Sequence, residues 1–273
     1  MKLLNGSELV DFIKVRQAKQ IRTLRQADKV FPKLAILQTI DDPVIDTYVR
    51  MKRRYGDDIL VDVDVRKVAQ ADLLAAISQL NSDESIHGII VQLPLAIPAE
   101  TQAAIDAVDP SKDVDGLGAN ATLDPATPTA INWLLAGYAV DLKAKTIAIV
   151  GMGRLVGAPL AKMWTNSGYI VTTFDEDNGD LSTLVDYDII VTATGVAGLI
   201  TPAMVKQGAV VVDAGTASEH GKIVGDVSSD VRERDDISIT PVRGGVGPLT
   251  VAALFDNVIT AATKVAELRK TSH

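Results

Sequence analysis

Short apolar runs alternate with amphipathic stretches along the chain, and this alternation is typical of parallel α/β folds. In the first half, the pattern predicts a polar helix over residues 7–26, strands over 33–39, 59–65 and 86–92, and helices over 44–54 and 69–81. The predicted strands are almost continuously apolar. We therefore expect a parallel sheet that is covered on both faces.

A second α/β unit begins near Lys145. The pattern there predicts strands over 147–150, 169–174, 189–194, 210–213 and 237–242, and helices over 156–164, 181–185, 202–206 and 250–269. Between the two units, residues 93–130 carry five prolines and few periodic apolar positions. Such a long irregular stretch is typical of a functional loop or a domain junction.

The segment from Thr146 to Gly157 joins a predicted strand, a glycine turn and a helix, and in this context glycines indicate dinucleotide binding. Gly151, Gly153 and Gly157 allow backbone to approach a pyrophosphate at the positive end of the helix. Asp175 ends the next predicted strand, where a carboxylate accepts hydrogen bonds from ribose hydroxyls. An ordinary βα turn explains the glycines alone, so the aspartate is what favours a nucleotide.

The composition narrows the classes of function. The 273 residues have a net charge of −8, which argues against a nucleic-acid partner held by its phosphates. There is no cysteine, and three scattered histidines (His87, His220, His273) do not form a metal site, so we expect no bound metal. The N-terminus lacks the apolar segment of a signal peptide, and no apolar run approaches the roughly 20 residues that span a bilayer. We expect a cytoplasmic protein with no membrane partner.

Two motifs in the first unit suggest proton transfer. Tyr48 and Lys52 share one helix face, and an amine held against an aromatic ring has a lowered pKa that suits acid–base work near neutral pH. A surface lysine beside a half-buried tyrosine is the alternative. Gln92 follows a predicted strand, where an uncharged amide can hold an amine without keeping it protonated. It is otherwise a polar strand cap.

Two loops add candidate binding groups. Carboxylates and a lysine lie between Asp109 and Gly116, which suits either a ligand site at a domain junction or a charged Asx-turn loop. Three glycines and two prolines lie between Pro241 and Thr250, where they permit close backbone approach to a ligand. A helix predicted to begin at Thr250 would direct its positive end at an anionic or carbonyl group.

In this order, the motifs resemble those of the bifunctional methylenetetrahydrofolate dehydrogenase/cyclohydrolase family. The resemblance covers almost the whole chain. The matching segments are Tyr48-x-x-x-Lys52, Gln92-Leu-Pro-Leu95, Lys112-Asp-Val-Asp-Gly116, Pro125-x-Thr-Pro128, the turn from Gly151 to Pro159, Ala193-Thr-Gly195 and Gly244 to Thr250. It implies two α/β domains with an active-site cleft between them. Residues 1–130 plus 250–273 form the folate-binding catalytic domain, and residues 131–249 form the Rossmann-like NAD(P)-binding domain.

The resemblance also implies the reactions and the site residues. The enzyme oxidises 5,10-methylenetetrahydrofolate to the methenyl form with NAD(P) and hydrolyses that product to 10-formyltetrahydrofolate, as a homodimer. Lys52 would be the general acid/base, Gln92 would hold it, Tyr48 would stack on the folate and Asp115 would bind the pterin edge. Gly247, Pro248 and Thr250 would line the folate pocket. The implied cofactor-binding residues are Gly151, Met152, Gly153, Arg154, Leu155, Val156, Gly157, Asp175, Thr194, Gly195 and Thr216.

Departures from the family pattern bear on the cofactor. Met152 and Gly153 stand where the family usually has an Arg-Ser pair that contacts the 2′-phosphate of NADP. Asp175 and Glu176 stand where it often has His-Ser. Carboxylates repel a phosphate, so we expect NAD to be preferred over NADP. Arg154 binding the phosphate is the alternative.

The sequence also allows other functions. A divergent relative could keep the fold as an enzyme with one of the two activities or as a regulatory protein that binds a nucleotide or folate. A protein that only binds would not need Lys52. A different dehydrogenase on the same plan explains the glycine turn but not the residues at positions 48, 52, 92 and 112–116.

Overall fold

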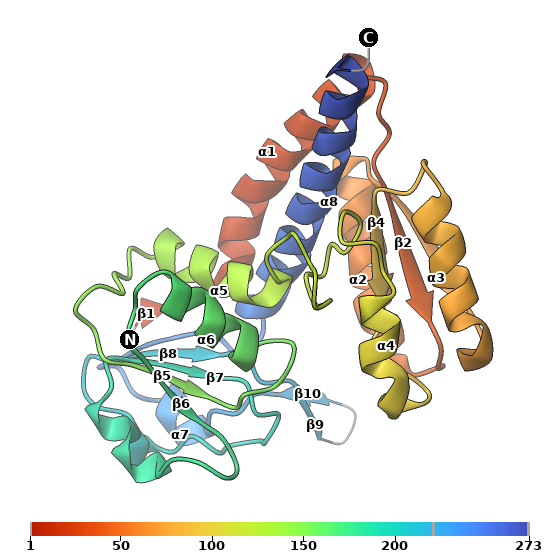
Figure 1. Cartoon of the computed structure of the whole chain (residues 1–273). Coiled ribbons are helices and arrows are strands. Elements are labelled where there is room, and N and C mark those ends of the chain that lie inside the picture. Colours follow the sequence, from red (N-terminus) through yellow and green to blue (C-terminus); the bar gives the residue numbers. More distant parts are fainter. Residues whose placement is uncertain (1, 220–221, 272–273) are drawn as a thin grey trace. The chain divides into compact units, whose positions relative to one another are not determined.

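The computed structural model describes residues 2–219 and 222–271, which form two compact units. Unit 1 comprises Met1–Val10 and Thr127–Thr250, and unit 2 comprises Asp11–Ala126 and Val251–His273. Two long helices, α1 (Gly6–Gln26) and α8 (Val246–Thr271), begin in unit 1 and continue into unit 2 (Figure 1).

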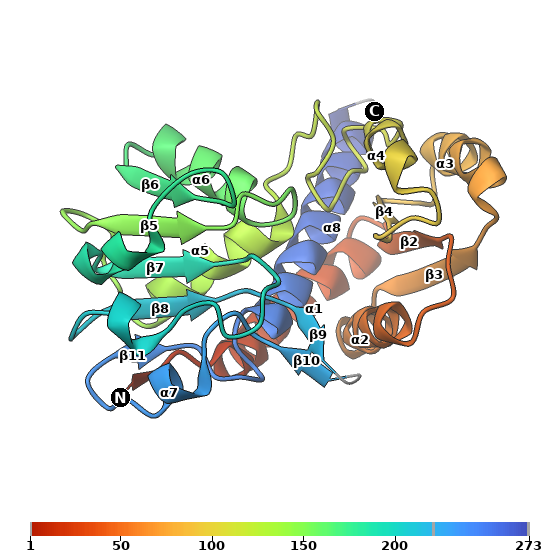
Figure 2. The same ribbon diagram turned by 90° about the horizontal axis from the view of Figure 1, so that it is seen from below.

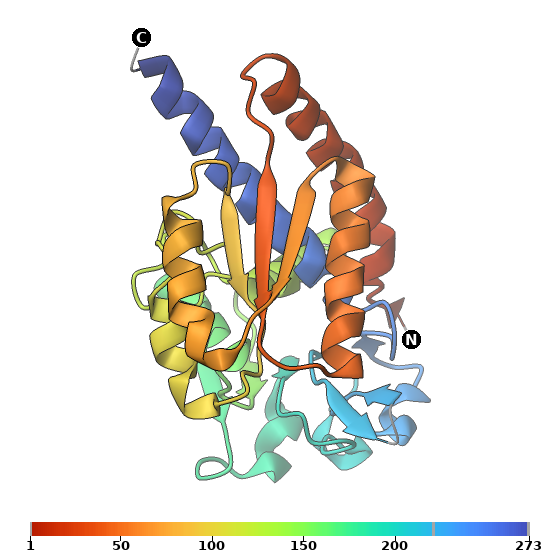
Figure 3. The same cartoon turned by 90° about the vertical axis from the view of Figure 1, so that its right-hand side faces the viewer.

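Unit 2 is built on a parallel three-stranded sheet of order β3-β2-β4, with β2 in the centre (Figure 3). The strands are β2 (Lys33–Gln38), β3 (Asp62–Lys67) and β4 (Gly88–Val91). The remaining helices of this unit are α2 (Pro43–Ile59), α3 (Leu73–Ser82) and α4 (Thr101–Asp106), with 3₁₀ turns η1 (Gln70–Asp72) and η2 (Pro98–Glu100).

Helix α2 is longer at its C-terminal end than the apolar pattern predicts. It begins after Asp42, whose carboxylate accepts hydrogen bonds from the backbone N–H groups of Val44 and Ile45. It ends at Leu60, which takes a left-handed conformation with φ of 69°. The strand predicted over 59–65 therefore begins at Asp62.

Both faces of the β2 sheet are buried. Ala35 and Leu37 of β2 share a buried cluster with residues of α3 and α4. Because side chains alternate along a strand, Leu34 and Ile36 face the other side, and they too are buried. Tyr55 of α2 stacks on Phe255 of α8, with ring centroids 5.1 Å apart.

Unit 1 is built on a six-stranded sheet of order β1-β11-β8-β7-β5-β6, in which every neighbouring pair is parallel (Figure 2). The strands are β1 (Lys2–Leu3), β5 (Ile147–Val150), β6 (Val171–Phe174), β7 (Ile189–Thr192), β8 (Val210–Asp213) and β11 (Ser238–Ile239). The bounds predicted for β5 and β8 are confirmed, and so is the predicted α/β class. A separate antiparallel pair consists of β9 (Ala217–Glu219) and β10 (Lys222–Val224).

The strand order places a topological switch point beside β5, because the chain passes from β5 to β6 on one side and to β7 on the other. Open α/β sheets bind ligands at the carboxyl ends of their strands at such a point. The helices of this unit are α5 (Ala126–Gly137), α6 (Gly157–Asn166) and α7 (Ser229–Arg232), with 3₁₀ helices η3 (Leu181–Asp186) and η4 (Pro202–Met204). The apolar pattern did not predict α5.

Among the described residues, α8 is long and apolar enough to cross a membrane by length and composition. Within its apolar window, 61% is buried inside the protein. The residues Val251–Phe255, Val258 and Ile259 are among those buried. Burial in the protein core thus accounts for the apolar character of this helix.

Candidate active site

Lys52 and Gln92 meet in unit 2. The Nζ atom of Lys52, on α2, donates a hydrogen bond of 2.8 Å to Oε1 of Gln92, the residue that follows β4. The Gln92 side chain is itself fixed, because its Nε2 donates to the Leu93 carbonyl oxygen at 3.0 Å. The neutral amide oxygen of Gln92 thus fixes the position of the Lys52 amine. It adds no negative charge that would keep the amine protonated.

Tyr48 and Lys52 lie one turn apart on α2 and share a face of the helix. Both side chains are partly buried. Burial raises the pKa of the Tyr48 hydroxyl and lowers the pKa of the Lys52 amine, because it disfavours the charged form of each group. The shift of Lys52 is in the direction that suits proton transfer near neutral pH.

Asp115 lies close enough to Lys52 for the two charges to interact. Burial lowers the pKa of Lys52, and the Asp115 carboxylate partly opposes that effect. The pKa of Asp115 is raised by burial, while Lys52 lowers it and Asp113 raises it. Within unit 2, Lys52 thus bonds to Gln92 and lies in electrostatic range of Asp115.

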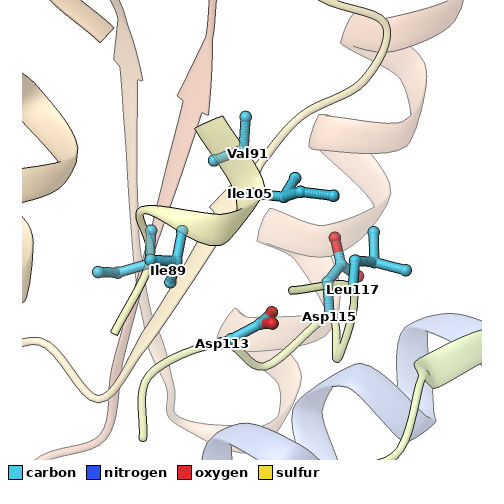
Figure 4. Close-up of a pocket in the computed structure, with 7 residues that line it drawn as sticks. Ile89, Val91, Ile105, Asp113, Asp115 and Leu117 are labelled. Atoms are coloured by element: carbon cyan, nitrogen blue, oxygen red, sulfur yellow. The ribbon is translucent and has the colours of Figure 1, made fainter. Parts of the chain in front are cut away.

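The loop that carries Asp115 is held by its neighbours. Asp113 accepts hydrogen bonds from the backbone N–H groups of Gly116 and Gly118, at 3.0 and 2.8 Å. Figure 4 shows Asp113 and Asp115 around a small pocket with apolar side chains of β4 and α4. Asn257 of α8 donates to the carbonyl oxygens of Val114 and Asp124, both at 2.9 Å. No motif singles out Asn257 in the sequence, because its partners lie more than a hundred residues away.

Lys112 belongs to the same motif as Asp115 but has a structural position. Its Nζ atom donates to three backbone carbonyl oxygens near the C-terminal end of α3, those of Leu80, Asn81 and Asp83, at 3.0, 2.7 and 2.8 Å. A cation there also interacts favourably with the helix dipole. This part of the motif is therefore a helix cap rather than a ligand contact.

Replacing Lys112 is expected to destabilise the fold and leave the chemistry intact. Lys112→Met removes the donor from three carbonyl oxygens, and we expect a loss of about 2 kcal/mol in the free energy of unfolding. Urea denaturation measures this loss, with Lys143→Met on an exposed turn as the control. A variant that is fully stable but inactive would show instead that Lys112 contacts the substrate.

The glycine turn of unit 1 is packed as a phosphate-binding turn requires. Gly151 has φ of +90°, and a Cβ there would lie 2.7 Å from the Ala193 carbonyl oxygen. A Cβ at Gly157 would lie 1.8 Å from the Gly151 carbonyl oxygen. Glycine is therefore required at both positions. At Gly153 a Cβ would meet nothing within 4 Å, so the surface of the turn is open there.

The other predicted cofactor residues surround this turn or follow neighbouring strands. Gly153, Arg154 and Leu155 are exposed, and Met152 and Val156 are partly buried. The N–H of Gly151 donates to the Phe174 carbonyl oxygen at 2.7 Å, which places the end of β6, and the exposed Asp175 after it, beside the turn. Thr216 is exposed in the segment after β8. This surface fits a dinucleotide, because the backbone is accessible at a helix start and a carboxylate follows the adjacent strand.

Thr194 and Gly195 follow β7, and a buried carboxylate fixes them. The backbone N–H groups of both residues donate to Asp226, at 2.6 and 3.0 Å. Asp226 is fully buried. The sequence does not single out Asp226. It follows Gly225, and only the structure shows that a side chain at that glycine would collide with the buried Asp213.

The predicted folate-contacting residues Gly247, Pro248 and Thr250 lie in the first turns of α8. This helix begins at Val246, before the predicted start at Thr250, because proline is tolerated in the first turn of a helix. A Cβ at Gly247 would meet nothing within 4 Å. Thr250 Oγ1 donates to Thr127 Oγ1 at 3.4 Å. These residues belong to unit 1, and Lys52 and its partners belong to unit 2.

Among the described residues, no group of three or more His, Cys, Asp or Glu side chains is placed to hold a metal ion. His87 is buried, and burial lowers its pKa to about 4, so it is neutral at physiological pH. Its Nδ1 accepts from the Lys33 N–H at 3.3 Å. The other two histidines, His220 and His273, lie outside the described residues.

The chain matches known proteins over nearly its full length. Residues 4–115 match the family model described as "Tetrahydrofolate dehydrogenase/cyclohydrolase, catalytic domain", and residues 125–266 match that of the NAD(P)-binding domain. "Bifunctional protein FolD" of Lacticaseibacillus paracasei is 39% identical, with 96% of this chain and 97% of that protein covered. The corresponding protein of Nautilia profundicola is 35% identical, with 98% and 99% covered.

Solved structures give the same result. The bifunctional FolD enzyme of Campylobacter jejuni superposes with a TM-score of 0.90 at 35% identity, with 97% of this chain and 99% of that one covered. The FolD enzyme of Trypanosoma brucei, whose structure is described as complexed with NADP and an inhibitor, superposes with a TM-score of 0.88 at 30% identity, with 96% and 97% covered. On these matches, the chain belongs to the tetrahydrofolate dehydrogenase/cyclohydrolase family.

Proposed function

We propose that this methylenetetrahydrofolate dehydrogenase/methenyltetrahydrofolate cyclohydrolase uses Lys52 as the proton-transfer group of its hydrolytic step. The observation that carries the proposal is the hydrogen bond from Lys52 to Gln92, with Asp115 close by. A binding protein has no need for a partly buried lysine that is held in this way. A proton-transfer step does need a titrating group that is held in position, and Lys52 is such a group.

The two reactions make different demands on the protein. When bound, NAD(P) would supply the acceptor for the hydride that leaves the methylene carbon of the substrate, and the glycine turn with Thr194 and Gly195 would hold it. This oxidation needs mainly correct positioning of the reacting atoms. In the second reaction, water adds to the methenyl carbon of the cation and gives up one proton. The bond from that carbon to N5 then breaks as N5 takes up a proton and the carbinol hydroxyl releases one, so the products are the 10-formyl compound and one net proton. We assign to the Lys52 amine the uptake of the proton from the attacking water and its return to N5.

We assign the substrate-binding roles from the resemblance to the family. Tyr48, on the same helix face as Lys52, stacks on the folate ring system, and Asp115 binds the pterin edge. Gly247, Pro248 and Thr250 contact the folate as well. The open surface at Gly247 supports this assignment, because a substrate can approach the backbone there.

We further propose that NAD is preferred over NADP. Family membership does not decide the cofactor, because one similar structure is described as an NADP complex. In this chain Met152 and Gly153 offer no charged side chain at the turn, and the exposed Asp175 follows the adjacent strand. A carboxylate at that position accepts bonds from ribose hydroxyls and repels a 2′-phosphate.

The cofactor preference can be measured directly. We expect kcat/KM with NAD to exceed that with NADP by about tenfold or more, because one unfavourable charge pair of about 1.4 kcal/mol is sufficient for that ratio. Asp175→Ser should reduce the ratio by a similar factor. Glu233→Gln is the control. It removes one negative charge from an exposed residue after α7, away from β5 and β6, and should leave the ratio unchanged. A wild-type preference for NADP, lost in Arg154→Ala, would show instead that Arg154 binds the phosphate.

We also propose that the enzyme is a cytoplasmic homodimer, on the basis of the family resemblance. Light scattering coupled to gel filtration tests the oligomeric state. A particle with the mass of one chain over the working concentration range would contradict it.

A further inference from the structure

Asp226 directs both oxygens of its carboxylate to one segment of unit 1. Its Oδ2 accepts hydrogen bonds from Thr192 Oγ1 at 2.7 Å and from the Thr194 N–H at 2.6 Å. Its Oδ1 accepts from the Gly195 N–H at 3.0 Å. The residue is fully buried. A buried carboxylate is costly unless it is hydrogen-bonded, so these donors compensate for its burial and are held by it in turn.

The carboxylate itself is confined. A Cβ at Gly215 would lie 2.0 Å from Asp226 Oδ1, so the backbone of Gly215 packs directly against the carboxylate. Charge-assisted hydrogen bonds to a confined acceptor fix the direction of the donors. Residues 192–195 therefore have little freedom to rearrange.

A second buried carboxylate fixes the backbone of Asp226. Asp213 accepts the N–H groups of Asp226 and Val227, both at 3.1 Å, and that of Gly215 at 3.0 Å. It also pairs with Arg232, whose Nη1 donates to the Thr240 carbonyl oxygen at 2.8 Å. The two aspartates thus connect the ends of β7 and β8 to the segment after β10.

The segment held by Asp226 lies at the switch point of the sheet. Thr194 and Gly195 follow β7, and the Ala193 carbonyl oxygen packs against Gly151 of the glycine turn. Gly195 has φ of +72°, and a Cβ there would meet nothing within 4 Å. The segment is therefore fixed from inside the protein by Asp226 and open on its outer side, as a preformed binding surface requires.

We propose that Asp226 is a positioning residue for the nicotinamide cofactor: it fixes the backbone of Thr194 and Gly195 before the cofactor binds. This inference rests on the proposed assignment of those two residues to the cofactor site. Since the hydrolytic step uses no cofactor, a defect in this device should affect the dehydrogenase reaction and spare the cyclohydrolase reaction.

Asp226→Asn is the main test. The asparagine amide has the shape of the carboxylate but only one acceptor oxygen. Its NH₂ group would face N–H or O–H donors that the carboxylate now accepts, so part of the bonding to residues 192–195 is lost. We expect the KM for NAD to rise about tenfold or more in a folded protein. We expect the rate of methenyltetrahydrofolate hydrolysis without cofactor to stay within about twofold of wild type. That change is much smaller than the tenfold change expected in the KM for NAD. An unchanged KM for NAD, or equal loss of both activities, would overturn the proposal.

A milder pair of variants covers the case in which Asp226→Asn does not fold. Thr192→Val removes one of the donors to Asp226 and should raise the KM for NAD. Thr192→Ser keeps the hydroxyl and should have a KM for NAD close to that of wild type. Thr146→Val makes the same change at the amino end of β5, where the Thr146 hydroxyl donates to the Asp186 carbonyl oxygen at 3.1 Å, and should have no effect on the KM for NAD. If both Thr→Val variants change that KM equally, the effect is not specific and the proposal fails.

One further variant separates this inference from the cofactor site itself. Gly153→Val adds a side chain where the protein leaves open space, so it should weaken NAD binding through contact with the cofactor alone. If Gly153→Val weakens NAD binding and Asp226→Asn does not, the proposed cofactor site stands and the role of Asp226 is wrong. If neither variant changes NAD binding, the cofactor-site assignment fails, and the role of Asp226 fails with it.

Discussion

Replacement of Lys52 by methionine is expected to slow the cyclohydrolase reaction strongly at every pH. Methionine has nearly the length of the lysine stem but no group that can carry a proton. General acid–base catalysis contributes about 10²- to 10⁴-fold, so the hydrolysis rate should fall by that factor. The decay of methenyltetrahydrofolate absorbance, corrected for an enzyme-free blank, measures this rate.

The dehydrogenase reaction of the same variant serves as an internal control. Hydride transfer depends on positioning rather than on a titrating group, so Lys52→Met should reduce it far less than it reduces hydrolysis. Lys19→Met on the exposed surface of α1 provides the matched substitution and should leave both rates unchanged. Hydrolysis at the full wild-type rate in Lys52→Met would refute the role assigned to Lys52.

The elements that the sequence predicts well are those in which burial alone decides the structure. Residues 147–150 and 210–213 are almost continuously apolar, and the bounds predicted for β5 and β8 are confirmed. Between α2 and β3 the prediction was wrong, because Leu60 ends the helix in a left-handed conformation without glycine or proline to mark it. At such a position the packing of the folded chain, rather than the local preference of the residue, decides where the helix ends.

Some residues of the candidate site can be predicted from local sequence patterns, and others cannot. Tyr48 and Lys52 are related by helical spacing, and Gln92 by its place after a strand, so local patterns are sufficient to single them out. Asn257 and Asp226 act through hydrogen bonds to backbone groups that are distant in sequence. Neither has a spacing that a single sequence reveals, and only the folded chain shows what they hold.

Gln92→Glu is expected to move the pH dependence of hydrolysis to higher pH. The substitution puts a carboxylate where an amide oxygen accepts a bond of 2.8 Å from Lys52 Nζ. An opposite charge at that distance stabilises the ammonium form and raises a pKa by about 1 to 3 units. If the free amine of Lys52 takes up the proton of the attacking water, the rate rises as pH passes through the pKa of Lys52. The rising limb in Gln92→Glu should therefore lie about 1 to 3 pH units above that of wild type.

At a pH below both limbs the two rates differ by about tenfold for each unit of the pKa shift, so Gln92→Glu should be about 10- to 1000-fold slower than wild type there and should recover on the alkaline side. Gln92→Met is the matched control, since it removes the acceptor without adding charge. Loss of that acceptor disfavours the ammonium form, so the pKa of Lys52 should fall and the limb should move to lower pH. Shifts of opposite sign in the two variants follow only if Gln92 sets the protonation of Lys52. A uniform loss of rate with no shift in either variant would mean that Gln92 orients the substrate instead.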